Sequence, residues 1–66
     1  MKQNRENELA RLEATLREEM NRFERLHDEL RLAIDGGEYD RADKVSRQIS
    51  QLLNMIQADL HAARHS

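Results

Sequence analysis

The chain of 66 residues contains no cysteine, no proline and no tryptophan, and only two glycines, one tyrosine and one phenylalanine. Without cysteine there can be neither a disulfide framework nor a thiolate zinc site. No apolar run is long enough to cross a bilayer, and the opening MKQNRENELARL lacks the apolar core of a secretory signal. These absences predict a cytoplasmic protein that does not insert into a membrane.

Charged residues are abundant but nearly balanced, with 13 acidic against 11 basic side chains and a net charge of −2. This balance argues against binding to a nucleic-acid backbone. Charged residues make up 36% of the chain and aromatic residues 3%, a composition that often accompanies disorder. The order of the residues indicates a folded protein instead, because the apolar residues recur at a helical period.

Two stretches of the chain carry an a/d heptad seam, the pattern of coiled coils. In the first stretch the a positions are Leu9, Leu16, Phe23 and Leu30, and the d positions include Leu12, Leu26 and Ala33. Glu19 interrupts the d series, and we expect the neighbouring Met20 to lean into the seam there. In the second stretch the a positions are Ala42, Ile49, Ile56 and Ala63, with Val45 and Leu52 at d. The seams predict one helix over residues 4–34 and another over residues 39–64.

Both glycines, Gly36 and Gly37, lie between the predicted helices in the sequence DGGE. Glycine takes the left-handed backbone conformation at a helix C-terminus without the steric cost of a Cβ atom. We therefore expect a turn at residues 35–38, with both glycines left-handed. The chain is then an all-α protein, a single-domain antiparallel hairpin over residues 1–66 that resembles a coiled coil. This reversal is expected to place Phe23 opposite Ile49, Met20 opposite Leu52, and Leu12 opposite Leu60.

The predicted hairpin has more apolar surface than one seam can bury, because residues such as Leu32 and Met55 lie beside the seam. A second hairpin could cover this surface, and we expect a homodimer in the form of a four-helix bundle; a partner protein is the alternative. The residues expected at the interface are Leu16, Met20, Phe23, Ile34, Ile49, Leu53, Ile56 and Leu60.

Residues with catalytic or metal-binding chemistry are few and poorly placed for it. His61 and His65 have the i,i+4 spacing of two metal ligands on a helix, but a third ligand is not evident. Ser46 and Ser50 have no histidine and acid placed to form a triad. The acidic residues around Gly36-Gly37 would repel a phosphate. We expect no enzyme activity, no metal and no cofactor.

The segment LRLAIDGGEYDRADKVSRQISQL resembles the UVR motif, the helical hairpin of bacterial excision-repair proteins and of some protease adaptors. The residues that match in register are Ala33, Glu38, Tyr39, Asp40, Ala42, Val45, Ile49 and Leu52. They cover about a third of the chain. Ser46-Arg47 stands where the family has Arg-Asp, and Asp43 replaces its second alanine. The resemblance implies a docking hairpin of a bacterial adaptor rather than a catalyst.

Two further bacterial families share the hairpin outline. Flagellar and type III secretion export chaperones are similar small hairpins with a Gly-acid-Tyr reversal, and they hold a helix of a client protein. Sporulation-type aspartyl-phosphate phosphatases carry SQxLD on their second helix, where residues 50–54 here read SQLLN. Asn54 replaces the acid on which that activity depends. The sequence therefore favours a self-associating module that binds and regulates a larger protein, with a chaperone-like binder and a response-regulator phosphatase as alternatives.

Overall fold

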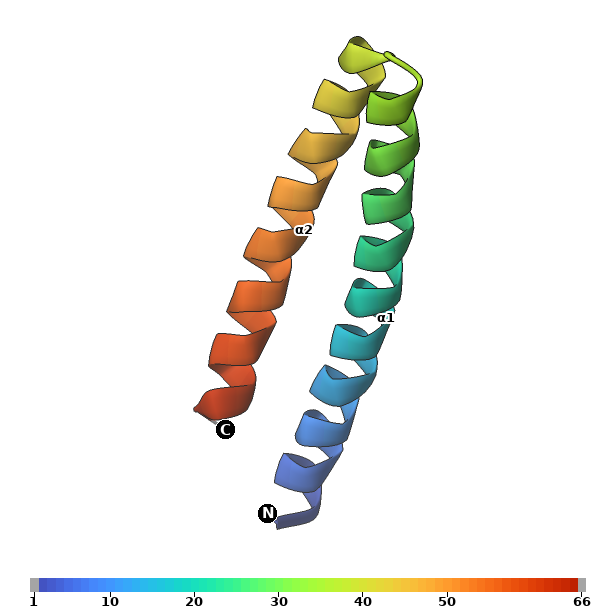
Figure 1. Ribbon diagram of the computed structural model, residues 1–66. Coiled ribbons are helices and arrows are strands. Elements are labelled where there is room, and N and C mark those ends of the chain that lie inside the picture. Colours follow the sequence, from blue (N-terminus) through green and yellow to red (C-terminus); the bar gives the residue numbers. More distant parts are fainter. Residues whose placement is uncertain (1, 66) are drawn as a thin grey trace.

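The computed structural model describes residues 2–65, including the side chains of residues 6–65. Within these residues there are two α-helices and no strand: α1 spans Lys2–Asp35 and α2 spans Tyr39–Arg64. The helices run antiparallel from a tip at residues 36–38 and form a rod of 53 × 15 × 11 Å (Figure 1). This arrangement confirms the prediction of an all-α hairpin.

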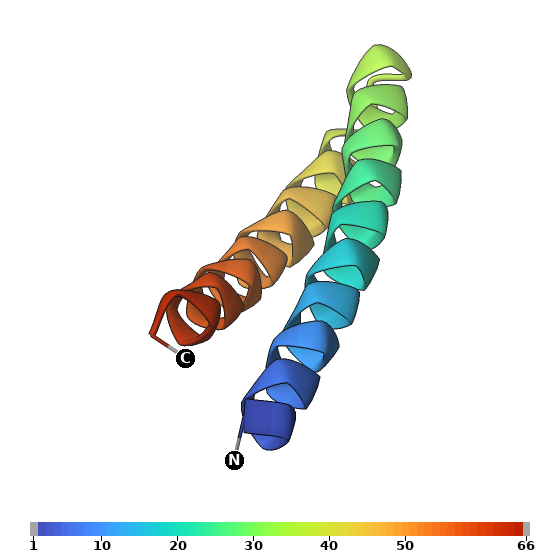
Figure 2. The same cartoon turned by 90° about the horizontal axis from the view of Figure 1, so that it is seen from below.

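The two helices differ in length, with 34 residues in α1 and 26 in α2. Helix α2 begins and ends at the residues expected from the heptad pattern, whereas α1 extends beyond the expected range 4–34 at both ends. At 1.5 Å per residue, α1 is longer by about 12 Å, and its N-terminus projects past the end of α2 (Figures 1 and 2). The end of the hairpin opposite the tip is therefore formed by α1 alone.

The tip is a Schellman motif, a helix C-terminus closed by two reverse hydrogen bonds. The Glu38 N–H donates to the Ala33 carbonyl at 2.8 Å, and the Gly37 N–H donates to the Ile34 carbonyl at 3.1 Å. Gly37 is left-handed, with φ of 72°, as this motif requires. Gly36 is not left-handed, and its N–H still donates to the Leu32 carbonyl at 3.0 Å. The expectation that both glycines are left-handed is therefore wrong for Gly36.

The two glycines should respond differently to alanine. We expect Gly37→Ala to lower the free energy of unfolding by about 1 kcal/mol because a Cβ strains the left-handed conformation. A Cβ at Gly36 would lie 3.4 Å from the Leu32 carbonyl oxygen, an ordinary contact. Gly36→Ala should therefore be neutral or stabilising by a few tenths of a kcal/mol. Urea unfolding followed by circular dichroism measures both; equal losses would contradict the Schellman assignment.

Burial is greatest between the tip and the middle of the hairpin. The apolar core consists of Leu26, Val45, Leu52 and Ile56, with partly buried Leu16, Phe23, Leu30 and Ile49 packed against it. Ala33 and Ala42 are buried next to the tip, where their small side chains permit a close approach of the helices. Toward the other end the helices diverge (Figure 1), and no described residue before Glu19 or after Ile56 is fully buried.

Glu19, rather than Met20, occupies the interrupted position in the seam. Only 6% of Glu19 is exposed, whereas Met20 is 47% exposed. Glu19 continues the d series at the seven-residue spacing, so the backbone turns it toward α2 whatever its chemistry. The expectations that Met20 leans into the seam and faces Leu52 are therefore wrong. Leu60, predicted to face Leu12, is likewise 45% exposed.

Charged residues alternate with the apolar residues along both helices. Among the described residues, neither helix is both long and apolar enough to cross a membrane.

Candidate interaction surface

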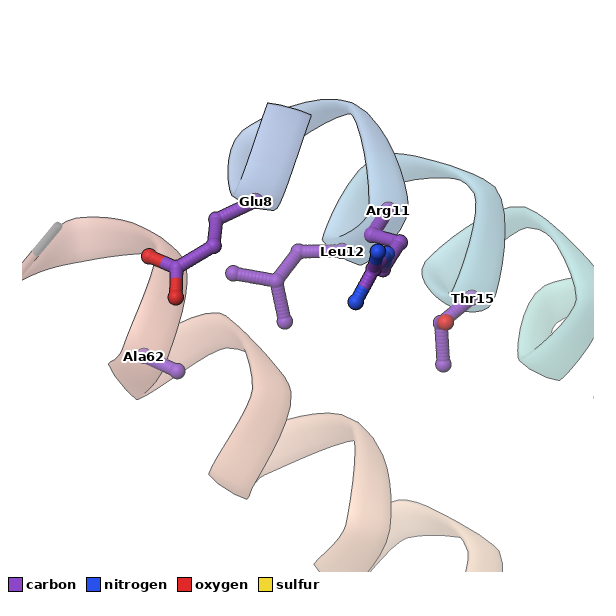
Figure 3. A pocket seen from close by; sticks show the side chains of 5 residues that line it. All are labelled: Glu8, Arg11, Leu12, Thr15 and Ala62. Atoms are coloured by element: carbon purple, nitrogen blue, oxygen red, sulfur yellow. The ribbon is translucent and has the colours of Figure 1, made fainter. Parts of the chain in front are cut away.

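A shallow hollow near the open end of the hairpin is lined by residues of both helices. These residues identify which side of α1 and which side of α2 lie next to each other. The hollow has a volume of about 360 Å³ and is lined by Glu8, Arg11, Leu12 and Thr15 of α1 and by Ala62 of α2. Figure 3 shows Leu12 and Glu8 pointing from α1 toward the helix that carries Ala62. Ala62, and not the predicted Leu60, therefore lines this hollow together with Leu12.

A second hollow continues along the same flank toward the middle of the hairpin. Its volume is about 210 Å³, and its lining residues are Thr15, Glu18, Glu19, Arg22, Leu52 and Met55. Thr15 lines both hollows. Met55 and Ala62 are seven residues apart on α2, as are Thr15 and Arg22 on α1, so each pair lies on one side of its helix. We call this side the polar flank, because most of its lining side chains are polar.

The opposite side of the seam carries a different set of residues. On a heptad wheel, position g, the residue before a, lies next to d on one side of the seam. Position e, four residues after a, lies next to a on the opposite side of the seam. Thr15 and Arg22 precede a positions and lie on the polar flank. The positions four after a, Met20 and Ile34 on α1, must then lie on the opposite side. The same relation on α2 places Leu53 and Leu60 on that side.

This second side is largely apolar and open to solvent, although the same heptad position also holds Glu13, His27 and Ser46. Four of its residues are exposed, Met20 at 47%, Ile34 at 50%, Leu53 at 42% and Leu60 at 45%. Next to them on the heptad wheel lie the half-buried residues at a positions. We call this the apolar face, and it consists of Leu16, Met20, Phe23, Leu30, Ile34, Ile49, Leu53 and Leu60.

Seven of the eight residues predicted for an interface lie on the apolar face. The exception is Ile56, which is 9% exposed and belongs to the hairpin's own core. Leu30, which is not among the predicted interface residues, also lies on this face. Of the other apolar residues beside the seam, Met55 lies on the polar flank and Leu32 is 68% exposed on α1. The predicted turn residues Gly36 and Gly37 form the tip.

Residues considered for catalysis or metal binding are not brought together with partners for that chemistry. The His61 and His65 rings lie 4.3 Å apart, centre to centre, on the exposed end of α2. Among the described residues, no group of three or more His, Asp or Glu side chains is arranged to hold a metal ion. Gln51 and Asn54, within the SQLLN segment, are both exposed.

Glu19 is the one charged residue that is buried among those whose side chains are described. Both of its carboxylate oxygens are shielded from solvent, and the acid that acts on them is Asp59. Burial raises the pKa of Glu19, because the charged form is poorly solvated inside the hairpin. Asp59 raises this pKa further, since it can accept a hydrogen bond from protonated Glu19 and its negative charge repels the ionised form. The sequence carried a signal for this burial, since Glu19 is seven residues from both Leu12 and Leu26.

The chain matches no protein-family model, no curated protein and no solved structure.

Proposed function

We propose that this protein is a non-catalytic interaction module that pairs with a second copy through its apolar face and, as a dimer, binds and regulates a larger protein. The observation that carries the proposal is the size of the uncovered surface. The hairpin exposes 5659 Å², whereas a compact protein of 7.8 kDa exposes about 4,400 Å². Its radius of gyration is 15.4 Å, against about 11 Å for a compact chain of this length.

A second copy accounts for this excess. A compact protein of twice the mass would expose about 7,300 Å². Compared with two separate hairpins, each exposing 5659 Å², a compact dimer would therefore remove about 4,000 Å² in total. Obligate homodimers bury about 2,000–5,000 Å². The area that two hairpins would lose together is thus of the size that a stable dimer buries.

The arrangement of the apolar face supports the same partner. It runs along both helices, so two hairpins placed face to face form a four-helix bundle. In that bundle the half-buried Leu16, Phe23 and Ile49 would become core residues alongside the exposed Leu53. A single amphipathic helix from a client, as in the chaperone-like alternative, would lie in the same groove but would cover less of it.

Sedimentation equilibrium of the purified chain tests the proposal. We expect a mass of twice 7.8 kDa at micromolar concentration. A helical monomer throughout the micromolar range would overturn self-association. A monomer that forms a one-to-one complex with a co-purified client would favour the chaperone-like alternative instead.

A further inference from the structure

Two acidic side chains meet across the seam at the point where close packing of the hairpin ends. Glu19 of α1 is only 6% exposed, both of its carboxylate oxygens are shielded from solvent, and its partner on α2 is the half-buried Asp59. Glu19 lies seven residues before the core residue Leu26. Asp59 lies seven residues after the core residue Leu52. The acidic pair therefore stands where the next apolar pair of d positions would continue the core.

Two carboxyl groups can be joined by a hydrogen bond only when one of them is protonated, because an ionised carboxylate accepts hydrogen bonds but donates none. With one proton, the Glu19–Asp59 pair is bonded and carries a single negative charge. When this proton passes to water, the bond is lost and two negative charges face each other across the seam. Their repulsion is weakly screened where one of them is buried. Loss of the proton thus converts an attraction between the helices into a repulsion.

The charged groups around the pair do not substitute for the proton. Glu18 and Arg22 lie beside Glu19 on α1, where they line the hollow on the polar flank. The titratable group that faces Glu19 from α2 is Asp59. The ion pairs formed by the described side chains lie near the tip, so Arg22 does not pair with Glu19. The charge between the helices is therefore set by the protonation of the two acids.

The acidic pair separates two parts of the hairpin that differ in packing. We call the residues of α1 before Glu19 and of α2 after Asp59 the outer half. No described residue of the outer half is fully buried, and the helices diverge there (Figure 1). The apolar core lies on the tip side of the pair. Little buried surface therefore opposes a separation of the helices in the outer half, whereas the core holds the remainder together.

We propose that Glu19 and Asp59 form a latch operated by a proton, which keeps the outer half closed while it is held between the two carboxyl groups and lets this half open when it is released. Opening would uncover the partly buried seam residues Leu12 and Leu16. Burial and the adjacent acid both raise the pKa of Glu19, so the latch stays closed at a pH where an exposed glutamate is already ionised. The latch joins the two helices of one hairpin and does not depend on the proposed dimer.

A nitroxide label at the end of α2 tests this opening. Ala62→Cys places the label beside Leu12 and Thr15, with which Ala62 lines the hollow near the open end. The natural chain has no cysteine, so the label is attached only at this position. In mild acid we expect the label to broaden the amide NMR signals of Leu12 and Thr15. As the pH rises this broadening should be lost, with the same midpoint as the ¹³C chemical shift of the Glu19 carboxyl carbon.

Gln48→Cys is the matched position for the label. Gln48 has the same heptad position as Ala62 and lies two heptads nearer the tip. A label there should broaden the amide signals around Leu26 throughout the same pH range, because the core keeps this part closed. Each labelled chain is mixed with an excess of unlabelled chain, so that the broadening arises within one hairpin.

Two substitutions in the Ala62→Cys chain replace the titrating proton by a permanent donor. In Glu19→Gln the amide donates a hydrogen bond to Asp59 at every pH, and in Asp59→Asn the amide donates to Glu19. Both variants should retain the broadening across the pH range. Glu24→Gln, at an exposed position of the same helix, should lose it at the same pH as the unsubstituted chain.

Three results would overturn the latch. One is broadening from the Ala62 position that does not change with pH. Another is a loss of broadening that persists in Glu19→Gln and Asp59→Asn, since a different group would then titrate. The third is a simultaneous loss of broadening from the Gln48 position, which would mean that the whole hairpin unfolds rather than its outer half.

Discussion

Replacing Leu53 with glutamate is expected to convert the dimer into a monomer at micromolar concentration. Leu53 is 42% exposed in the hairpin, at the centre of the apolar face. Full burial of a leucine contributes about 1.5–3 kcal/mol, so burying the exposed 42% of Leu53 contributes roughly 0.6–1.3 kcal/mol, which a two-fold dimer loses twice. The substituted glutamate adds the cost of desolvating a charge, and the dissociation constant should therefore rise by at least about one order of magnitude. Sedimentation equilibrium over a concentration series measures the change.

Leu32→Glu is the matched control for this variant. Leu32 is also a helical leucine, and at 68% exposed it is the more accessible of the two, but it lies outside the apolar face. The same substitution there should leave the dimer intact. If Leu32→Glu dissociates the dimer as strongly as Leu53→Glu, the interface lies on another side of the hairpin.

The second large effect is expected at Glu19. Replacing this side chain with leucine should raise the free energy of unfolding by about 1–3 kcal/mol at neutral pH, because a buried carboxyl group next to a second acid is removed. Glu19→Gln should give a smaller increase, since it removes the charge but leaves a buried polar group. Urea unfolding at pH 7 measures both. Glu24→Leu, at an exposed position of the same helix, should change stability by less than about 0.5 kcal/mol.

The pH dependence of stability provides a further check on Glu19. Its pKa in the folded chain is raised above the ordinary value of 4.5, so the folded state binds more protons than the unfolded state between these two values. The contribution of Glu19 therefore favours folding in mild acid and is lost as the pH rises through the raised pKa. The charged groups near it are Asp59, Glu18 and Arg22. A stability profile unchanged by Glu19→Gln would contradict the burial of this group.

Heptad spacing was sufficient to predict the helices and their antiparallel pairing. Apolar residues that recur every seven positions fall on one side of a helix, and both the spacing and the apolar character can be read directly from the sequence. The glycine pair located the turn for the same reason. The spacing did not show which glycine would be left-handed, because the position of the left-handed residue depends on where α1 ends. The hydrogen bonds that the Gly37 and Glu38 N–H groups donate to the last carbonyls of α1 place this residue at Gly37.

The exchange of Met20 for Glu19 shows where residue chemistry misled the prediction. An acid at a d position interrupts the apolar series, so the sequence alone favours the nearest apolar side chain in its place. The regular spacing of Leu12, Glu19 and Leu26 was the stronger signal, since Met20 lies about 100° further around the helix. The proximity of Asp59 to Glu19 could not be predicted without knowing how the helices align across the seam.

The concentration of burial near the tip also bears on the order in which the hairpin folds. Contacts between Ala33 and Ala42 close a loop of about ten residues, an event of about 10–100 ns, whereas contacts at the open end join residues far apart in sequence. Once the tip has formed, each further turn of α1 meets its neighbour on α2 with little additional loop entropy. We therefore expect the helices to pair from Gly37 outward, so that the divergent end closes last and opens first.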